Sequence, residues 1–245
     1  MKFIEGGVTA PAGFRANALR AGIKESRKKD DTALIFSEVP AAAAGIFTRN
    51  RVRAEPVKLS IQHLSGGKAR AIVVNAGNAN ACTGSRGREA ALRMAEAAAR
   101  CLHIRAEDVL VASTGVIGQQ LPVEKIEAVM PDLVRGLSAG GNVLAREAIL
   151  TTDTASKECA AETVIGGKRV VIGAMAKGSG MIHIDMGTML GFVTTDCAVS
   201  AAMLRRALEE SAAGTYNCVS IDGDTSTNDS LFILANGRAG NPEIT

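Results

Sequence analysis

Apolar runs separated by turn residues divide this chain into predicted strands. Several runs are continuous and rich in β-branched residues, which is typical of strands covered on both faces. They predict strands at 32–37, 69–75, 108–112, 163–174, 189–194, 217–221 and 230–235. A Gly166-Gly167 pair lies inside the run 163–174 and predicts a tight hairpin there.

Helical periodicity fills most of the intervals between these runs. It predicts helices at 86–101, 122–137, 144–150 and 200–213. Pro122 suits the first turn of the second helix, and Ser200 is a candidate N-cap of the last. Alternating strands and helices indicate an α/β fold, while the predicted hairpin argues against a wholly parallel sheet.

Composition narrows the class of protein. The chain has 245 residues, of which 47% are hydrophobic, enough for one large domain or two small ones. The net charge of +3 is not gathered in a stripe, and aromatic residues make up 3% with no Trp, so nucleic-acid binding is not indicated. No apolar run approaches the roughly 18 residues that span a bilayer, and the N-terminus lacks a signal-peptide core. We therefore expect a cytoplasmic protein with no membrane segment.

Cysteine and histidine usage argues against disulfides and metal. The five cysteines include no CxxC pair, and the three histidines stand far apart without metal-ligand spacing. We expect reduced thiols and no metal site.

The most informative segment is KGSGMIHIDMGTML at 177–190, a Gly-rich loop that leads through Gly187-Thr188 into an apolar run. A threonine at a new N-terminus carries its own α-amine, with a pKa of about 7.7–8.0, which can take the hydroxyl proton. Cleavage between Gly187 and Thr188 would therefore create a nucleophile. Gly187 suits the scissile position because it tolerates strained dihedrals. An ordinary loop entering a buried strand would give the same pattern.

Two further loops could serve acyl chemistry. STGVIG at 113–118 follows a predicted strand, so the Thr114 hydroxyl and the Gly115 amide are candidate oxyanion donors. TTDT at 151–154 could hold the amine and carboxylate of an amino acid, and the Lys177 ammonium could reach a carboxylate. Each also has a plain interpretation: a turn, a polar loop in which Asp153 caps a neighbour, and a solvated lysine.

The sequence does not decide the function of two further polar loops. The Asn/Gly-rich loop 75–84 and the Asp-rich loop 222–229 each follow a predicted strand and could bind substrate or metal. The second loop lacks the Gly and the terminal Glu of an EF-hand at the required offsets.

Taken together, the segments of this chain are similar to those of one family. The similarity rests on 6–14, 45–52, 75–84, 113–118, 151–154, 177–190 and 222–229, which occur in the same order. In these motifs the chain resembles the ornithine acetyltransferase family, also called glutamate N-acetyltransferase. The resemblance implies an α/β fold of the DmpA/ArgJ type, with two β-layers sandwiched between α-helices and a topology distinct from the N-terminal-nucleophile hydrolases.

The same resemblance implies an arginine-biosynthesis enzyme that cuts itself between Gly187 and Thr188 into α and β chains, which stay associated as a heterotetramer. Thr188 would be the nucleophile, and Thr114 and Gly115 would form the oxyanion hole. Thr151, Lys177 and Thr188 would bind substrate.

The implied reaction is acetyl transfer from N2-acetylornithine to glutamate through an acetyl-threonine intermediate in a ping-pong scheme. It requires no cofactor. Acetyl-CoA could serve as an additional donor substrate, and the sequence leaves this open.

Two features depart from the family pattern. Gly187 replaces the usual Ala and is chemically permissive. Ile184-Asp185 replaces Pro-Asn, which loosens the loop and adds a charge near the scissile bond, so we expect slower processing. The chain also ends at Thr245, where the family continues, so we expect 1–187 to be the α chain and 188–245 the start of a truncated β chain. Such a fragment is expected to aggregate or be inactive.

Two alternatives remain. A self-processing aminopeptidase or amidohydrolase would use the same threonine with water as acceptor. An uncleaved, inactive binding or assembly protein would keep only the fold.

Overall fold

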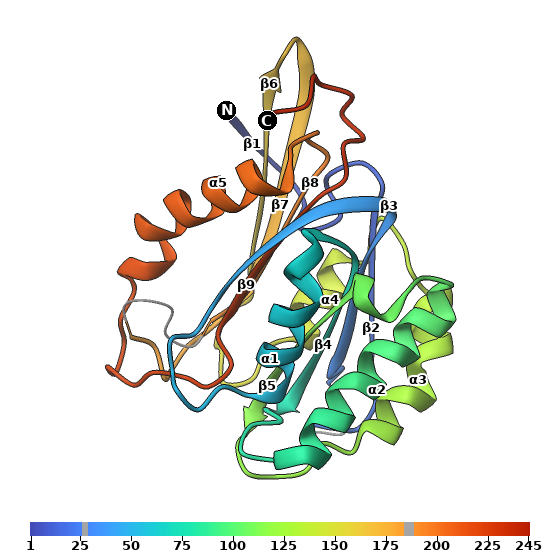
Figure 1. The fold of residues 1–245 in the computed structure, drawn as a ribbon, viewed down its shortest axis with the longest axis vertical. Helices are drawn as coiled ribbons and strands as arrows, with labels where there is room; N and C mark the ends of the chain where they lie inside the picture. Colours follow the sequence, from blue (N-terminus) through green and yellow to red (C-terminus); the bar gives the residue numbers. More distant parts are fainter. Residues whose placement is uncertain (26–28, 184–188) are drawn as a thin grey trace.

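A computed structural model describes residues 1–25, 29–183 and 189–245. In these ranges the chain forms nine strands and five α-helices (Figure 1). The strands are β1 (Lys2–Ile4), β2 (Phe14–Leu19), β3 (Thr32–Phe47), β4 (Lys68–Asn78), β5 (Val109–Val116), β6 (Lys157–Ile165), β7 (Lys168–Lys177), β8 (Leu190–Thr195) and β9 (Ser230–Ala235). The helices are α1 (Glu55–His63), α2 (Gly84–Leu102), α3 (Val123–Arg135), α4 (Asn142–Ala148) and α5 (Ala201–Ala213).

All nine strands belong to one mixed sheet, in the order β1-β6-β7-β8-β9-β3-β4-β5, with β2 also paired to β3. The pairs β4–β5 and β8–β9 are parallel. The remaining pairs among the described strands are antiparallel, including the β6–β7 hairpin that turns at Gly166 and Gly167. The sheet is therefore mixed, as the hairpin signal predicted.

The long strand β3 connects two parts of this sheet. Its residues 32–37 pair with β2, its residues 32–36 and 41–42 pair with β4, and its residues 42–47 pair with β9. The pairing with β4 shifts register between Phe36 and Ala41. Pro40 lies in this irregular stretch, where the missing N–H interrupts no regular ladder. The irregularity lets one strand serve both parts of the sheet.

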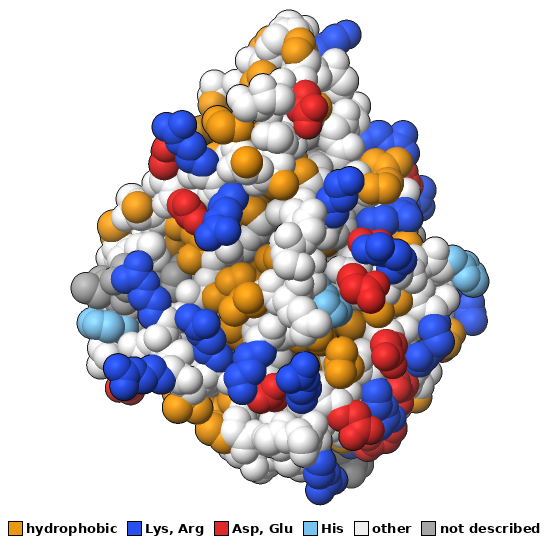
Figure 2. Space-filling view, in the orientation of Figure 1, with side chains coloured by type: hydrophobic (Ala, Val, Ile, Leu, Met, Phe, Trp, Pro, Cys, Tyr) orange, Lys and Arg blue, Asp and Glu red, His pale blue; other side chains and the backbone are white. Residues whose placement is uncertain are grey.

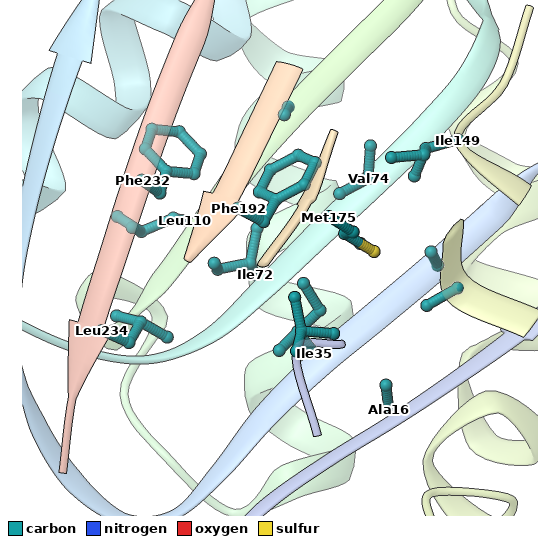
Figure 3. Packing of buried hydrophobic residues seen from close by; sticks show 14 of the residues in the cluster. Ala16, Ile35, Ile72, Val74, Leu110, Ile149, Met175, Phe192, Phe232 and Leu234 are labelled. Atoms are coloured by element: carbon teal, nitrogen blue, oxygen red, sulfur yellow. The ribbon is translucent and has the colours of Figure 1, made fainter. Parts of the chain in front are cut away.

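The main core lies between these two parts (Figure 3). Phe192 from β8 and Phe232 from β9 share a buried cluster with Ile72 from β4 and Leu110 from β5. The rings of Phe192 and Phe232 are 6.0 Å apart between centroids. The β7-β8-β9 part and the β4-β5 part thus form two β-layers packed on each other.

Helices cover the outer sides of both layers. On one side, Met94 of α2 and Ile126 of α3 are buried in a cluster with Val73 of β4. On the other side, Leu204 and Leu208 of α5 pack with residues of β9, in a cluster that includes Leu231 and Ile233. The α/β fold with two β-layers between helices is therefore confirmed.

Most predicted elements are present, and one is wrong. The run 217–221 is not a strand: a 3-10 turn spans Tyr216–Cys218, and Val219 and Ile221 are 39% and 62% exposed. The prediction failed because an apolar run without a neighbouring strand has no ladder to join. Ser200 is the N-cap of α5, since its hydroxyl accepts the Met203 N–H at 3.4 Å. Sequence patterns missed β1, β2 and α1.

Surface charges are intermixed on the face shown in Figure 2. Acidic and basic side chains alternate over α2 and α3, where Arg93 forms an ion pair with Glu127. None of the helices in the described ranges is long and apolar enough to cross a membrane.

Candidate active site

Polar side chains gather where β5 and β7 end. Thr114 and Gly115 lie near the end of β5, and Lys177 is the last residue of β7. Lys177 Nζ donates a hydrogen bond to Thr114 Oγ1 at 3.3 Å. Lys177 is 3% exposed and Thr114 is 7% exposed, so this contact is withdrawn from solvent. Sequence motifs single out both residues, which are 63 positions apart in the chain, and they meet where these two strands end.

Asp153 connects Lys177 to the polar loop after α4. Its side chain is fully buried, and its Oδ2 lies 3.9 Å from Lys177 Nζ. The same carboxylate accepts the Gly178 N–H at 2.7 Å, the Lys157 ammonium at 2.9 Å and the Thr151 N–H at 3.4 Å. Asp153 therefore fixes the backbone of Thr151 beside the end of β7.

Burial and charge act on this pair in opposite directions. Burial lowers the pKa of Lys177, while the carboxylates of Asp153 and Asp229 act to raise it. Burial alone raises the pKa of Asp153. Hydrogen bonds from Lys157 and Gly178, together with the Lys177 charge, outweigh burial and hold that pKa below its ordinary value. The carboxylates thus favour a protonated Lys177 inside a buried site.

The Gly115 position requires glycine. Its φ is +132°, and a Cβ there would lie 2.2 Å from the carbonyl carbon of Gly77. Gly77 is its register partner on β4, so the two backbones approach where β4 and β5 end. A side chain at Gly115 would push the strands apart. The backbone next to Thr114 is therefore held by direct strand contact.

Asparagine side chains hold the loops around this edge. Asn75 Oδ1 accepts the Ser113 hydroxyl at 2.5 Å, and Asn75 Nδ2 donates to the Asn78 carbonyl at 2.9 Å. Asn228 Nδ2 donates to the carbonyls of Ser113 and Ala79, at 2.8 and 2.6 Å. In these contacts the Asn-rich loop and Asn228 serve to fix the backbone before Thr114.

The loop 222–229 contacts the residue that follows the predicted nucleophile in the chain. Gly187 and Thr188 lie outside the described residues, but Met189 follows Thr188 directly in the chain. The Met189 N–H donates to Asp229 Oδ1 at 2.9 Å. Asp229 is 1% exposed and its charge acts on Lys177, so Met189 is tied to the same buried cluster.

The structure thus brings together four of the predicted site residues: Thr114, with its neighbour Gly115, and Lys177 by direct contact, and Thr151 through Asp153. Sequence reasoning missed Asp153 as the connecting group, and it missed Lys157 and Asp229. The sequence signal for Asp153 and Asp229 was their place in the polar loops 151–154 and 222–229, whereas Lys157 lies outside both loops, at the start of β6. In the described parts of the chain, no group of three or more His, Cys, Asp or Glu side chains could hold a metal ion.

The fold has counterparts among solved structures. The L-aminopeptidase D-Ala-esterase/amidase of Ochrobactrum anthropi, described as a variant of the Ntn-hydrolase fold, matches 96% of this chain and 75% of its own. The TM-score is 0.58 and the identity 13%, so this likeness defines the class of fold alone.

Closer likenesses define the family. A crystal structure of arginine biosynthesis bifunctional protein ArgJ from Bacillus halodurans has a TM-score of 0.70 at 40% identity, covering 77% of this chain and 97% of that one. The ornithine acetyltransferase of Mycobacterium tuberculosis, solved in complex with ornithine, has a TM-score of 0.69 at 40% identity, covering 77% and 99%. The sequence profile of the ArgJ family matches residues 15–245, and the chain belongs to this family.

Curated relatives agree with this assignment. Arginine biosynthesis bifunctional protein ArgJ of Symbiobacterium thermophilum is 54% identical over all 245 residues. The protein of the same name from Gloeobacter violaceus is 52% identical over 244 residues. The present chain spans 61% and 60% of the lengths of these two relatives.

Proposed function

We propose that this chain supplies part of an acetyltransferase of arginine biosynthesis, which moves the acetyl group of N2-acetylornithine to glutamate. The observation that carries the proposal is the buried Lys177, which contacts the Thr114 hydroxyl and lies beside Asp153 at the strand ends. Membership of the ArgJ family supports the reaction. The ornithine bound in the M. tuberculosis relative supports the substrate class.

The nucleophile in this proposal is Thr188, released by self-cleavage of the Gly187–Thr188 bond. Its own α-amine takes the hydroxyl proton as the oxygen attacks the acetyl carbonyl. The lengths of solved relatives support the cut. The aligned part is 77% of the 245-residue chain, about 189 residues, and it takes up 99% of the M. tuberculosis chain. A chain of that length is close to residues 1–187, the proposed α chain.

Thr114 is proposed to stabilise the oxyanion together with the Gly115 N–H. Because Thr114 Oγ1 accepts from Lys177, its own proton is available to a second acceptor. A donor that is itself polarised by an ammonium group is a stronger donor. Such a preorganised pair of donors stabilises the developing negative charge most strongly in a site from which water is excluded.

Lys177 and Thr151 are proposed to bind the amino-acid substrate, together with Thr188. A buried ammonium is a strong partner for a substrate carboxylate. Burial lowers the pKa of Lys177, and the nearby carboxylates of Asp153 and Asp229 act against that shift and favour its charged form. The Asp153 hydrogen bond to the Thr151 N–H holds the second binding residue in place.

The complete cycle is a ping-pong reaction. Ornithine leaves when the acetyl-Thr188 ester forms, and the amine of glutamate then takes the acetyl group. No cofactor enters this scheme, and acetyl-CoA enters only as an additional acetyl donor. We further propose that the α and β chains remain together as a heterotetramer in the cytoplasm.

A transfer assay tests the proposal. The full-length gene product is incubated with N2-acetylornithine and glutamate, and N-acetylglutamate, ornithine and acetate are quantified. The proposal predicts N-acetylglutamate in equal amount to ornithine, with none formed by the Thr188→Ala variant. Acetate without N-acetylglutamate would contradict it and favour an amidohydrolase. A parallel reaction with acetyl-CoA in place of N2-acetylornithine shows whether the second donor is used.

A further inference from the structure

Two carboxylates of one loop bind the backbone on the two sides of residues 184–188. Asp222 accepts the N–H groups of Met181 and Ile182, and Asp229 accepts the N–H group of Met189. Both carboxylates belong to the Asp-rich loop before β9, which the sequence left without a function. In the reaction proposed above, Asp222 has no role and Asp229 acts only through its charge on Lys177.

Met189 is held on both of its backbone groups. Its N–H donates to Asp229 Oδ1 at 2.9 Å, and its carbonyl accepts the Ser230 N–H at 3.1 Å. Asp229 is buried, and Ser230 begins β9, which runs beside β8 in the sheet. The anchor is therefore part of the packed sheet rather than of a loose loop.

The contact that holds Met181 and Ile182 involves an exposed carboxylate, in contrast to the buried Asp229. Asp222 Oδ2 accepts the Met181 N–H at 2.5 Å, and Oδ1 accepts the Ile182 N–H at 2.9 Å. The Ile182 carbonyl accepts the Ile221 N–H at 2.9 Å. Asp222 is exposed, and these backbone hydrogen bonds lower the pKa of its carboxyl group.

Cleavage of the Gly187–Thr188 bond would affect these two contacts differently. Asp222 belongs to the segment after Gly187–Thr188, while Met181 and Ile182 belong to the segment before it. Once that bond is cut, Asp222 holds the end of another chain. Asp229 and Met189 remain in one chain, and the Met189 nitrogen is the amide nitrogen of the Thr188 peptide bond.

We propose that Asp229 is a positioning residue for Thr188 in both self-cleavage and acetyl transfer, whereas Asp222 positions the chain for self-cleavage alone. The inference rests on the proposed function, because it takes Thr188 as the nucleophile. Met189 is bonded directly to Thr188, so a hydrogen bond that holds the Met189 N–H also restrains the residue before it. A displaced nucleophile lowers the rate of an attack that depends on alignment.

The experiment follows the full-length gene product after a short pulse of cell-free synthesis. Cut and uncut chains are quantified over time for the wild type, Asp229→Ala, Asp229→Asn and Asp222→Ala. Asp224→Ala is the matched control, because Asp224 is an exposed carboxylate of the same loop whose backbone N–H, which the substitution keeps, donates to Asp222. Acetyl transfer is then measured on each variant after cutting is complete.

We expect Asp229→Ala to slow both cutting and kcat for transfer by about 10- to 100-fold, the loss typical of a hydrogen bond to a charged group. Asp229→Asn keeps an acceptor oxygen and is expected to restore most of both rates. Asp222→Ala is expected to slow cutting only, leaving kcat within about 2-fold of wild type. Asp224→Ala is expected to change neither rate.

Three outcomes would overturn the inference: wild-type rates for Asp229→Ala, an equal loss of kcat in Asp222→Ala, or failure of Asp229→Asn to restore either rate in a folded protein. Thermal unfolding of each variant in a Thr188→Ala background, where no cut occurs, separates misfolding from mispositioning. If the wild type itself is never cut, the proposed function fails. If the wild type is cut and all variants match it, only the positioning roles fail.

Discussion

Two ion pairs in this protein differ in both geometry and surroundings. Arg93 and Glu127 join α2 to α3 through two hydrogen bonds, with 38% and 25% of their side chains exposed. Lys177 and Asp153 approach only to 3.9 Å, but their side chains are 4% and 0% exposed. The better geometry is thus found at the surface. Water screens such pairs, so a well-formed surface pair contributes little to stability, whereas separating a buried pair is costly.

The two ion pairs also differ in their relation to the candidate active site. Arg93 and Glu127 form hydrogen bonds with each other between α2 and α3. Lys177 contacts Thr114, and Asp153 holds Thr151, so the buried pair is part of the candidate active site. A buried lysine whose pKa is shifted by burial and by neighbouring charges is typical of a functional site.

Loss of the buried cation should have the largest effect. Lys177→Met keeps the length of the side chain and removes the charge that polarises Thr114. We expect kcat/KM for acetyl transfer to fall about 10²- to 10³-fold, the range seen when one oxyanion-stabilising donor is lost. Steady-state kinetics with N2-acetylornithine measure this. Glu127→Gln is the control, and an equal loss in that variant would remove the contrast between the two pairs.

Loss of the buried acid should reduce stability. Asp153→Ala leaves Lys177 buried with one partner fewer and frees the Gly178 and Thr151 N–H groups. We expect the free energy of unfolding to fall by about 3 kcal/mol. Urea denaturation in the uncut Thr188→Ala background measures it. A change within error would mean that Asp229 alone suffices to balance Lys177.

The same acid should give stability a dependence on pH. The pKa of Asp153 in the folded protein lies below its ordinary value of 3.8. Its contribution is therefore complete above pH 3.8 and is lost as the pH falls through the lower, folded-state pKa, because the unfolded chain binds the proton first. The free energy of unfolding, measured by denaturation at several pH values between 5 and about 2, should fall less steeply with decreasing pH in Asp153→Asn than in the parent. Parallel curves would contradict this origin.

Activity should also depend on pH at the alkaline end. Transfer needs a neutral α-amine on Thr188, so the rate should rise through about pH 7.7–8.0. It should fall again as Lys177 loses its proton, at a pH below 10.5 because burial lowers the pKa of this group. A rate that stays constant up to pH 10.5 would show that the Lys177 charge is not needed.

The smallest effect is expected at the surface pair. Glu127→Gln leaves Arg93 exposed to solvent, so no buried charge is left unpaired. We expect the melting temperature to change by about 2 °C or less, with normal transfer. A larger shift, measured by calorimetry at low and high salt, would mean that helix packing depends on this pair.

Local sequence patterns predicted helices and strands better than they predicted which of them pair or pack together. The run 230–235 coincides with β9, and Ser200 caps α5 as its residue type indicated. Val219 and Ile221 have strand-forming side chains, but no strand lies beside them, so the predicted strand 217–221 did not form. Propensity is overruled where pairing is absent.

The site could be predicted only in part for the same reason. The motifs around Thr114, Thr151 and Lys177 each stand out locally, and the family resemblance ordered them. The contacts made by Asp153 and Asp229 join residues 24 and 40 positions apart, from Asp153 to Lys177 and from Met189 to Asp229. Such contacts are set by strand register and sheet order, which a local pattern does not contain. The need for glycine at Gly115 likewise comes from its register partner Gly77.

The most direct test of this account is the intact mass of the freshly purified full-length gene product, measured beside its Thr188→Ala variant. The account predicts two fragments from the parent, the second beginning at Thr188 and gaining one acetyl group when N2-acetylornithine is supplied alone. It predicts one uncut chain from the variant. A single uncut chain from both proteins would contradict the claim that the buried Lys177–Thr114 cluster serves a self-generated threonine nucleophile.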